Sequence, residues 1–220
     1  MCRPPHQCIP VVCRGRRPRR PAIFSPIERA PHAGPPLQKH LNGVMHMTLK
    51  NGMEMTIAKA VREDAAELVA YLNIVGGESD NLTFGANERS ITVEWEEQFI
   101  ERVSKSTVSA LLVGRIDGEV ACIGSIDAHG RERMAHLANI ALSVKKKFWN
   151  LGVGTHMMKA LIDFARGNGK TEVLHLGVIS DNVHAIKLYK NLGFEEIGLY
   201  KKFFKVNGVY KDEILMNLYL

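Results

Sequence analysis

Residues 142–158 read LSVKKKFWNLGVGTHMM, and residues 182–194 read NVHAIKLYKNLGF. The first stretch predicts a strand that ends at Val144, a tight turn that carries Gly152 and Gly154, and a helix that begins near Thr155. The N-terminus of a helix leaves several backbone N–H groups without a partner, and they can converge on one anion. Glycine removes the Cβ atoms that would keep an anion away. The turn is therefore a candidate phosphate site.

The hydrophobic periodicity on either side of this stretch predicts a mixed α/β (α+β) protein. Two dipeptides, Asp117-Gly118 and Asn207-Gly208, predict hairpin turns. A helical crossover joins two strands that should be parallel, while the other strands should be antiparallel. Residues 76–87 are polar and rich in glycine, and we expect a loop there. The expected strands are 54–60, 108–116, 119–126, 135–144, 172–179, 194–206 and 210–219, and the expected helices are 62–75, 92–103, 155–167 and 182–192.

The formal net charge of +6 is unevenly distributed along the 220 residues. Residues 1–46 hold eight Lys or Arg and one acid, Glu28, together with all nine prolines. Residues 47–220 hold 21 basic and 22 acidic residues, a charge of −1. Because the first segment cannot bury much apolar surface, we expect residues 1–46 to be a disordered Pro/Arg-rich extension, or an upstream extension of the reading frame if Met45, Met47 or Met53 is the true start. The globular domain is expected over residues 47–220. Nucleic acid is an unlikely partner, because the basic arm lacks interleaved aromatic residues.

Three of the four cysteines lie in the first segment, Cys2, Cys8 and Cys13, in no common zinc spacing. Cys122 lies in an apolar run that reads as a buried strand, so a role as nucleophile is disfavoured. The histidines of residues 47–220 show no metal-ligand spacing, and no metal site is expected. The sequence also lacks an apolar run long enough to span a membrane.

Taken together, the glycine turn and the pattern Asn-x-x-Ala-x-x-Leu-Tyr-x-x-x-Gly-Phe at 182–194 resemble the GNAT N-acetyltransferases, which use acetyl-CoA. The order of elements over residues 47–220 is similar to that family, which implies a mostly antiparallel twisted sheet with one splayed parallel pair and about four helices. The family's phosphate loop begins with Gln or Arg, a position that Trp149 occupies here. The resemblance implies coenzyme contacts from these residues: Leu142, Ser143, Val144, Trp149, Asn150, Leu151, Gly152, Val153, Gly154, Thr155, Asn182, Ala185 and Tyr189.

The resemblance also implies the chemistry. Tyr189 is expected to be the general acid that protonates the leaving thiolate, because a phenol with a pKa near 10 can do so. A tyrosine that only packs at the cleft wall is the alternative. The oxyanion is expected to meet a backbone N–H near Val144. Relatives often carry Glu in the central strand, where this chain has Asn139, which cannot accept a proton. A water chain, His136 or Glu78 are the remaining candidates for the base.

The acceptor is expected to contact Glu78, Phe84 and Asn139. A lysine-type amine lies about three pKa units above neutral pH and costs roughly 4 kcal/mol to deprotonate, whereas an α-amino group costs only about 1 kcal/mol. The favoured function is a cytoplasmic N-acetyltransferase that moves acetyl from acetyl-CoA to a small-molecule amine by direct attack in a ternary complex. A homodimer is the expected assembly. Two alternatives stay open: a ribosomal-protein or peptide Nα-acetyltransferase, and a non-catalytic acyl-CoA sensor.

Overall fold

The computed structural model describes residues 43–220, which form an eight-stranded sheet in the order β1-β2-β3-β4-β5-β6-β8-β7. The expected disorder of the N-terminal extension and its three cysteines fall mainly in residues 1–42, outside the described residues. Only β5 and β6 pair in parallel; the other neighbours are antiparallel. The strands are β1 (Met45–Thr48), β2 (Glu54–Lys59), β3 (Ala110–Ile116), β4 (Glu119–Ala128), β5 (Leu137–Val144), β6 (Val173–Ile179), β7 (Glu195–Val206) and β8 (Val209–Tyr219).

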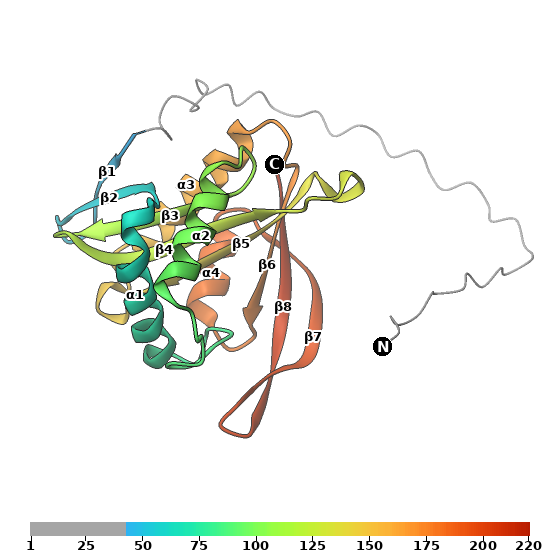
Figure 1. Ribbon diagram of the computed structural model, residues 1–220. Helices are drawn as coiled ribbons and strands as arrows, with labels where there is room; N and C mark the ends of the chain where they lie inside the picture. The colour runs from blue at the N-terminus through green and yellow to red at the C-terminus, as the bar shows by residue number, and fades with distance from the viewer. Residues whose placement is uncertain (1–42) are drawn as a thin grey trace, which may run out of the picture. The chain divides into compact units, whose positions relative to one another are not determined.

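Helices cover both faces of the sheet, as Figure 1 shows, with α1 and α2 in front of it and α3 behind. They are α1 (Ala65–Glu78), α2 (Val93–Ser104), α3 (Val153–Gly167) and α4 (Val183–Asn191), with 3-10 turns η2 (Arg62–Asp64), η3 (Glu132–Met134) and η4 (Lys146–Phe148). Successive residues of β3 face opposite ways, so Leu111 packs with α1 and α2 while Leu112 packs with α3. The predicted fold class, a mostly antiparallel mixed sheet with one parallel pair, is confirmed.

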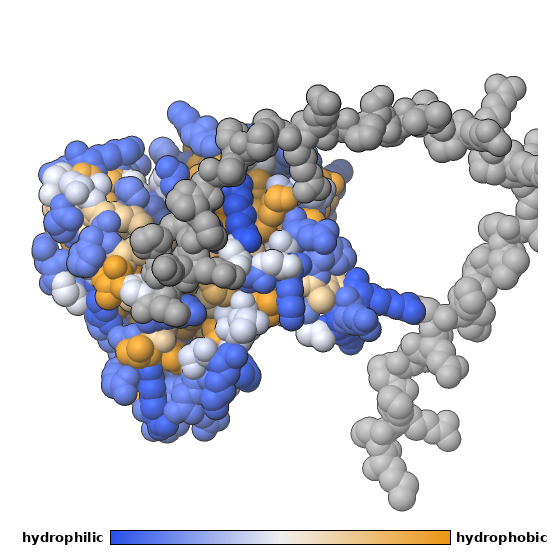
Figure 2. Space-filling view, turned by 90° about the horizontal axis from the view of Figure 1, so that it is seen from above, coloured by the Kyte–Doolittle hydropathy of each residue, from blue (hydrophilic) through white to orange (hydrophobic). Residues whose placement is uncertain are grey.

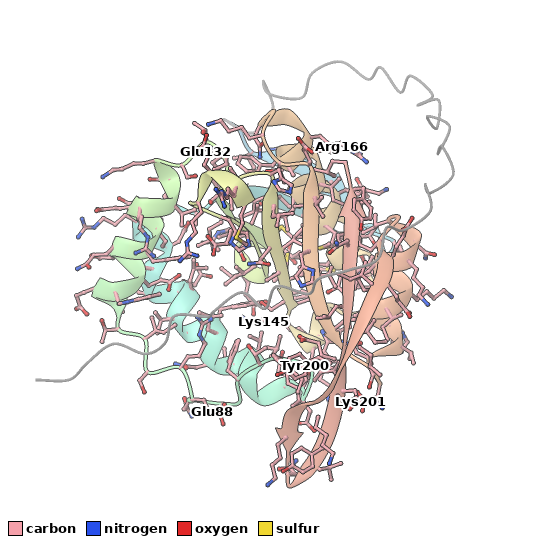
Figure 3. The ribbon with its side chains drawn as sticks, turned by 90° about the vertical axis from the view of Figure 1, so that its right-hand side faces the viewer. Glu88, Glu132, Lys145, Arg166, Tyr200 and Lys201 are labelled. Atoms are coloured by element: carbon pink, nitrogen blue, oxygen red, sulfur yellow. The ribbon has the colours of Figure 1, made fainter. Side chains whose placement is uncertain are left out.

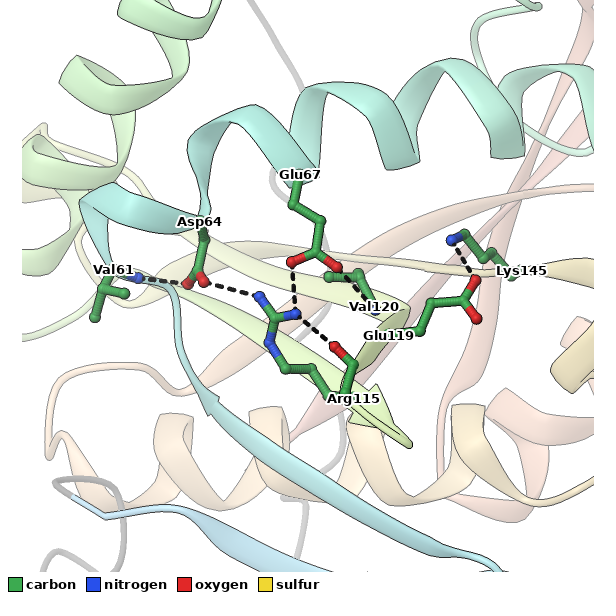
Figure 4. A network of polar contacts seen from close by, with 8 residues as sticks. Val61, Asp64, Glu67, Arg115, Glu119, Val120 and Lys145 are labelled. Atoms are coloured by element: carbon green, nitrogen blue, oxygen red, sulfur yellow. Dashed lines mark hydrogen bonds and ion pairs between the residues drawn. The ribbon is translucent and has the colours of Figure 1, made fainter.

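A network of ion pairs fixes α1 to the β3–β4 hairpin (Figure 4). The Arg115 guanidinium reaches Asp64 at 2.8 Å and Glu67 at 2.6 Å. The other carboxylate oxygen of Glu67 accepts a hydrogen bond from the Val120 amide. The network holds the helix in place over β3 and β4, and so positions the segment that follows the helix.

Two predicted boundaries differ from the structure for identifiable reasons. The expected loop at 76–87 begins later, because α1 continues through Gly76 to Glu78. A Cβ atom on Gly76 would lie 2.5 Å from the Gly85 carbonyl oxygen. Glycine at this position therefore allows the loop to pack closely against the helix. In addition, β1 was not predicted, and it spans the expected boundary at 46/47.

The β7–β8 hairpin extends away from the rest of the sheet, and Figure 3 shows Tyr200 and Lys201 near the point where it leaves. Nearly all side chains of β7 are exposed, and Phe203 packs edge-on against Tyr200 and Phe204. On the face seen in Figure 2, outside the grey atoms, hydrophobic residues lie in small groups among hydrophilic ones. Among the described helices, none is long and apolar enough to cross a membrane.

Candidate functional site

The site begins where β5 and β6 separate. Their parallel pairing covers only three register positions, Leu137 with Val173, Ala138 with Leu174 and Asn139 with His175. Beyond these, β5 stays paired with β4, and β6 stays paired with β8. The separation opens a cleft of about 790 Å³, which is lined by the free part of β5, by the turn after it, by α4 and by residues from α1 and α2. The expected splay of these two strands is therefore present.

The free edge of β5 presents backbone groups to this cleft. The Lys145 amide donates to the Ala121 carbonyl, which makes Val144 and Cys122 a non-hydrogen-bonded pair of the β4–β5 ladder. The backbone N–H groups of Val144 and Leu142 therefore point away from β4, toward the cleft. An extended ligand can bind to such an edge as an added strand would.

The turn after β5 supplies a second set of donors. Gly152 is the N-cap of α3, with φ +94°, a conformation that glycine adopts without strain. Its carbonyl accepts the first helical bond, from the His156 amide at 3.1 Å. The amides of Val153, Gly154 and Thr155 precede that bond and are the unpaired donors of the helix N-terminus, where the helix dipole also favours an anion. The fit to a diphosphate is good, because nothing larger than hydrogen projects from Gly152 or Gly154.

Trp149, the residue that departs from the family pattern, ties the turn to β5. Its indole nitrogen donates a 2.8 Å hydrogen bond to the Val144 carbonyl, and the side chain is 39% exposed. The bond satisfies the carbonyl while leaving the Val144 N–H at the open edge. The indole therefore holds the phosphate turn against the strand end.

The cation beside the turn comes from far away in the sequence. Lys145 and Lys147 both form ion pairs with Glu119, Lys145 at 2.8 Å, so neither is free for a phosphate. Lys50, between β1 and β2, lines the cleft instead, with its Cε 3.8 Å from the position of a Cβ on Gly152. Its amide also donates to the Leu151 carbonyl at 3.2 Å. No sequence pattern points to Lys50, because it lies in an ordinary turn.

The helix α4 brings Tyr189 to the cleft. Asn182 caps this helix by accepting a hydrogen bond from the Ala185 amide at 3.2 Å. The Tyr189 ring packs on Phe194, with the ring centroids 5.8 Å apart. Burial raises the pKa of Tyr189 to about 12, so the phenol keeps its proton at any neutral pH. Within residues 43–220, no group of the protein hydrogen-bonds its hydroxyl.

The other half of the cleft lies on the α1 and α2 side and is mostly apolar. Its walls include Leu72, Val75, Leu82, Phe84, Phe99, Leu111 and Ile123. Glu78 lines it too, but one carboxylate oxygen accepts a 2.7 Å hydrogen bond from the Lys146 amide. The hydroxyl groups of Ser143 and the buried Tyr71 are hydrogen-bonded to each other at 3.1 Å. Glu96 and Arg89 also line this half, and no pattern in our sequence analysis singled them out.

Most of the predicted site residues line this one cleft, and two do not. Leu151 packs its side chain against the core and uses its carbonyl for Lys50. Asn139 is exposed on β5 at the last paired position, before the strands separate. The cleft is lined by the other predicted residues: Glu78, Phe84, Leu142, Ser143, Val144, Trp149, Asn150, Gly152, Val153, Gly154, Thr155, Asn182, Ala185 and Tyr189.

Two other kinds of site have little support. Cys122 is fully buried in β4, and burial raises the pKa of its thiol. A buried protonated thiol is a poor nucleophile. Within the part of the chain that the structure describes, no cluster of three or more His, Cys, Asp or Glu could hold a metal ion.

Proteins with similar sequences include acetyltransferases. Residues 79–194 match the model of the acetyltransferase (GNAT) family. The L-amino acid N-acetyltransferase AaaT of Escherichia coli K12 is 34% identical over 56% of this chain and 73% of its own length. The N-alpha-acetyltransferase RimI of Mycobacterium tuberculosis is 27% identical over 52% of this chain and 70% of its own length.

Solved structures with a similar fold also include acetyltransferases. A GNAT acetyltransferase from Streptococcus pneumoniae superposes with a TM-score of 0.74 and 30% identity, over 76% of this chain and 99% of the other. The structure of yncA from Salmonella typhimurium, solved with its cofactor acetyl-CoA, has a TM-score of 0.67 at 23% identity, over 76% and 94% of the two chains. The protein therefore belongs to the GNAT family of N-acetyltransferases, which use acetyl-CoA as co-substrate.

Proposed function

We propose that this enzyme acetylates the amino group of a small molecule by direct attack on acetyl-CoA in a ternary complex. The observation that carries the proposal is the continuity of the cleft. One cavity joins the phosphate turn, the free edge of β5 and Tyr189 to the apolar half under α1 and α2. Both substrates can therefore be present at once, and no covalent enzyme intermediate is needed.

Three groups of the chain have distinct roles in this proposal. The amides of Val153, Gly154 and Thr155 hold the coenzyme's diphosphate. The Val144 N–H stabilises the oxyanion that forms when the amine nitrogen adds to the thioester carbonyl. The C–S bond then breaks, the Tyr189 hydroxyl gives its proton to the departing thiolate, and the proton that the acetylated nitrogen loses passes through solvent in the cleft to restore the phenol. A neutral phenol is required for that step, and the raised pKa of Tyr189 ensures it.

The size and polarity of the acceptor half support a small substrate. Its walls are largely aliphatic and aromatic, and the relative AaaT is named for L-amino acids. We therefore take free amino acids with apolar side chains as the first class to test. The expected homodimer and the cytoplasmic location stay predictions; sedimentation of the full chain tests the former.

A second candidate function is acetylation of a protein or peptide N-terminus. The similarity to RimI, an N-alpha-acetyltransferase, favours it. The low cost of deprotonating a peptide α-amino group, about 1 kcal/mol at neutral pH, also suits an enzyme that lacks the central-strand carboxylate common in relatives. An acyl-CoA sensor without turnover is the third possibility.

The deciding experiment measures free thiol release from acetyl-CoA by the full chain. Separate pools contain amino acids, other small amines and short peptides with free N-termini. Turnover with the amino-acid pool supports the proposal, and turnover with peptides alone replaces it by the second candidate. Acetyl-CoA binding without turnover in any pool would leave the sensor function.

A further inference from the structure

Glu96 occupies a position on α2 that the helical pattern reserves for apolar residues. Residues 96, 100 and 103 lie on one face of the helix, and Ile100 and Val103 belong to the core under α1 and α2. Glu96 is only 4% exposed. A carboxylate on the inner face of an amphipathic helix is unfavourable unless a partner compensates it.

The structure shows no such partner within residues 43–220. The neighbouring carboxylates on α2 are paired, since Glu97 and Glu101 both bind Arg62, at 2.6 Å and 2.5 Å. No described group donates a hydrogen bond to the Glu96 carboxylate. Among the described residues, every side-chain oxygen that is completely shielded from solvent has a hydrogen-bond partner. The Glu96 carboxylate has none, so its oxygens are open to the cleft that Glu96 lines.

A cation stands at the same cleft without pairing with Glu96. Arg89 lies over the Phe84 ring, 5.0 Å from its centroid, and both residues line the cleft. The positive charge of Arg89 lowers the pKa of Glu96, although burial raises it more. Among the described residues, the cleft therefore has a carboxylate and a guanidinium that form no ion pair with each other.

We propose that Glu96 binds the ammonium group of the acceptor and that Arg89 binds a carboxylate of the same molecule, so that the acceptor is a zwitterionic amino acid with an apolar side chain. The inference rests on the proposed function only for the identity of this half as the acceptor site. Asn139, where relatives often have a carboxylate, lies outside the cleft. Glu96 supplies the negative charge that holds the ammonium form of the acceptor.

The first test measures binding without turnover. The full chain is saturated with CoA, which cannot donate an acetyl group, and ligands are added in sets. Each set contains an amino acid (leucine, methionine or phenylalanine), its amide, which keeps only the ammonium group, and its deaminated acid, which keeps only the carboxylate. Calorimetry gives the Kd of each ligand for the wild type, Glu96→Gln and Arg89→Gln.

The two variants should lose different members of a set. Glu96→Gln should raise the Kd of the amino acid and its amide about 10- to 100-fold and leave the deaminated acid unchanged, because a hydrogen bond to a charged group is removed. Arg89→Gln should weaken the amino acid and the deaminated acid and spare the amide. Glu97→Gln, the same change one residue away on a surface ion pair, should match the wild type in every set.

Stability provides an independent readout. Neutralising an uncompensated buried carboxylate removes a desolvation cost, so Glu96→Gln should keep or raise the Tm of the ligand-free protein. Glu96→Asp should restore part of the affinity for the amide. The proposal is overturned if no ligand of any set binds the wild type, or if Glu96→Gln weakens all three ligand types equally. It is also overturned if the Tm of Glu96→Gln falls together with its ligand affinities. Failure of acetyl transfer with these binding results intact would overturn only the proposed function.

Discussion

The two halves of the cleft offer different chemical groups to a ligand. The coenzyme half uses the main chain: the free edge of β5 and the amides that begin α3, with Gly152 shaping the turn. The acceptor half uses side chains from α1, α2 and the loop between them, mostly apolar, with Glu96 and Arg89 as its charged members. A backbone site depends on a short local motif, whereas a side-chain site depends on how distant elements pack. The first half is therefore readable from sequence and the second is not.

The largest effect is expected where the two halves meet, at Tyr189. Tyr189→Phe removes only the hydroxyl, so the ring keeps its packing on Phe194. We expect kcat to fall roughly 100-fold or more, the usual contribution of a general acid, with the Kd of acetyl-CoA unchanged. Steady-state kinetics and calorimetry separate the two quantities. Tyr219→Phe, on the exposed end of β8, is the control; an unchanged kcat in Tyr189→Phe would remove this residue from the mechanism.

The second largest effect is expected at Gly152, because its conformation sets the position of the backbone amides that we propose bind the coenzyme. Gly152→Val places a branched side chain at φ +94°, a strain of about 1–3 kcal/mol that the turn relieves by moving its amides. We expect the Kd of acetyl-CoA to rise about 10- to 100-fold. Gly169→Val imposes a similar strain at φ +67° in a turn outside the cleft and should lower the Tm without weakening acetyl-CoA. Equal Kd values in the two variants would contradict a backbone site.

The same difference between the halves explains which site residues can be predicted from the sequence. The glycine turn, the Asn182 cap and Tyr189 lie within two short stretches whose spacing alone fixes a local geometry, and they reach the cleft as expected. Glu96 was missed because the helix at 92–103 was assigned from its apolar residues; counting back one turn from Ile100 gives the position, and a glutamate there is the signal. Asn139, expected as an acceptor contact, lies at the last paired position of β5 and not among the residues that line the cleft, because the point at which β5 leaves β6 depends on the whole sheet.

Other misses arose from long-range packing. A four-residue strand such as β1 carries too few alternations to be recognised, and only its pairing with β2 defines it. The glycines at 76 and 77 suggested a loop, but the close approach of Gly85 requires one of them within the helix. The pairing of Glu119, on the β3–β4 hairpin, with Lys145 and Lys147 is a long-range contact of the same kind, which no local pattern predicts.

The Lys50 side chain is expected to contribute a smaller part of the affinity for acetyl-CoA. Lys50→Ala removes the cation beside Gly152 and should raise the Kd of acetyl-CoA about 3- to 10-fold at low salt. The difference from wild type should shrink as salt is added, because an exposed charge is screened. Lys147→Ala should have no such effect, since Lys147 pairs with Glu119. Equal losses in both variants would indicate only a general change in surface charge.

The smallest effect concerns the link between the turn and β5. Trp149→Phe removes the indole donor from the Val144 carbonyl, which water can partly replace because the side chain is 39% exposed. We expect kcat/KM for acetyl-CoA to fall about 2- to 10-fold, the range of a single hydrogen bond. Trp95→Phe, on the acceptor half, should change the KM of the acceptor and not that of acetyl-CoA. A change in the KM of acetyl-CoA in Trp95→Phe, or a change confined to the acceptor in Trp149→Phe, would show that the two halves are not separate.

The hydrogen bond between the Lys50 amide and the Leu151 carbonyl joins parts of the chain that are roughly a hundred residues apart. The turn between β1 and β2 thus contributes one wall of a site whose other residues come mainly from the second half of the described chain. Because a ligand stabilises every segment that must be in place to bind it, coenzyme occupancy and docking of the β1–β2 turn are thermodynamically linked. The coenzyme should slow amide hydrogen exchange in residues 49–52, and an N-terminal truncation that loosens them should weaken coenzyme binding without removing any residue of the glycine turn.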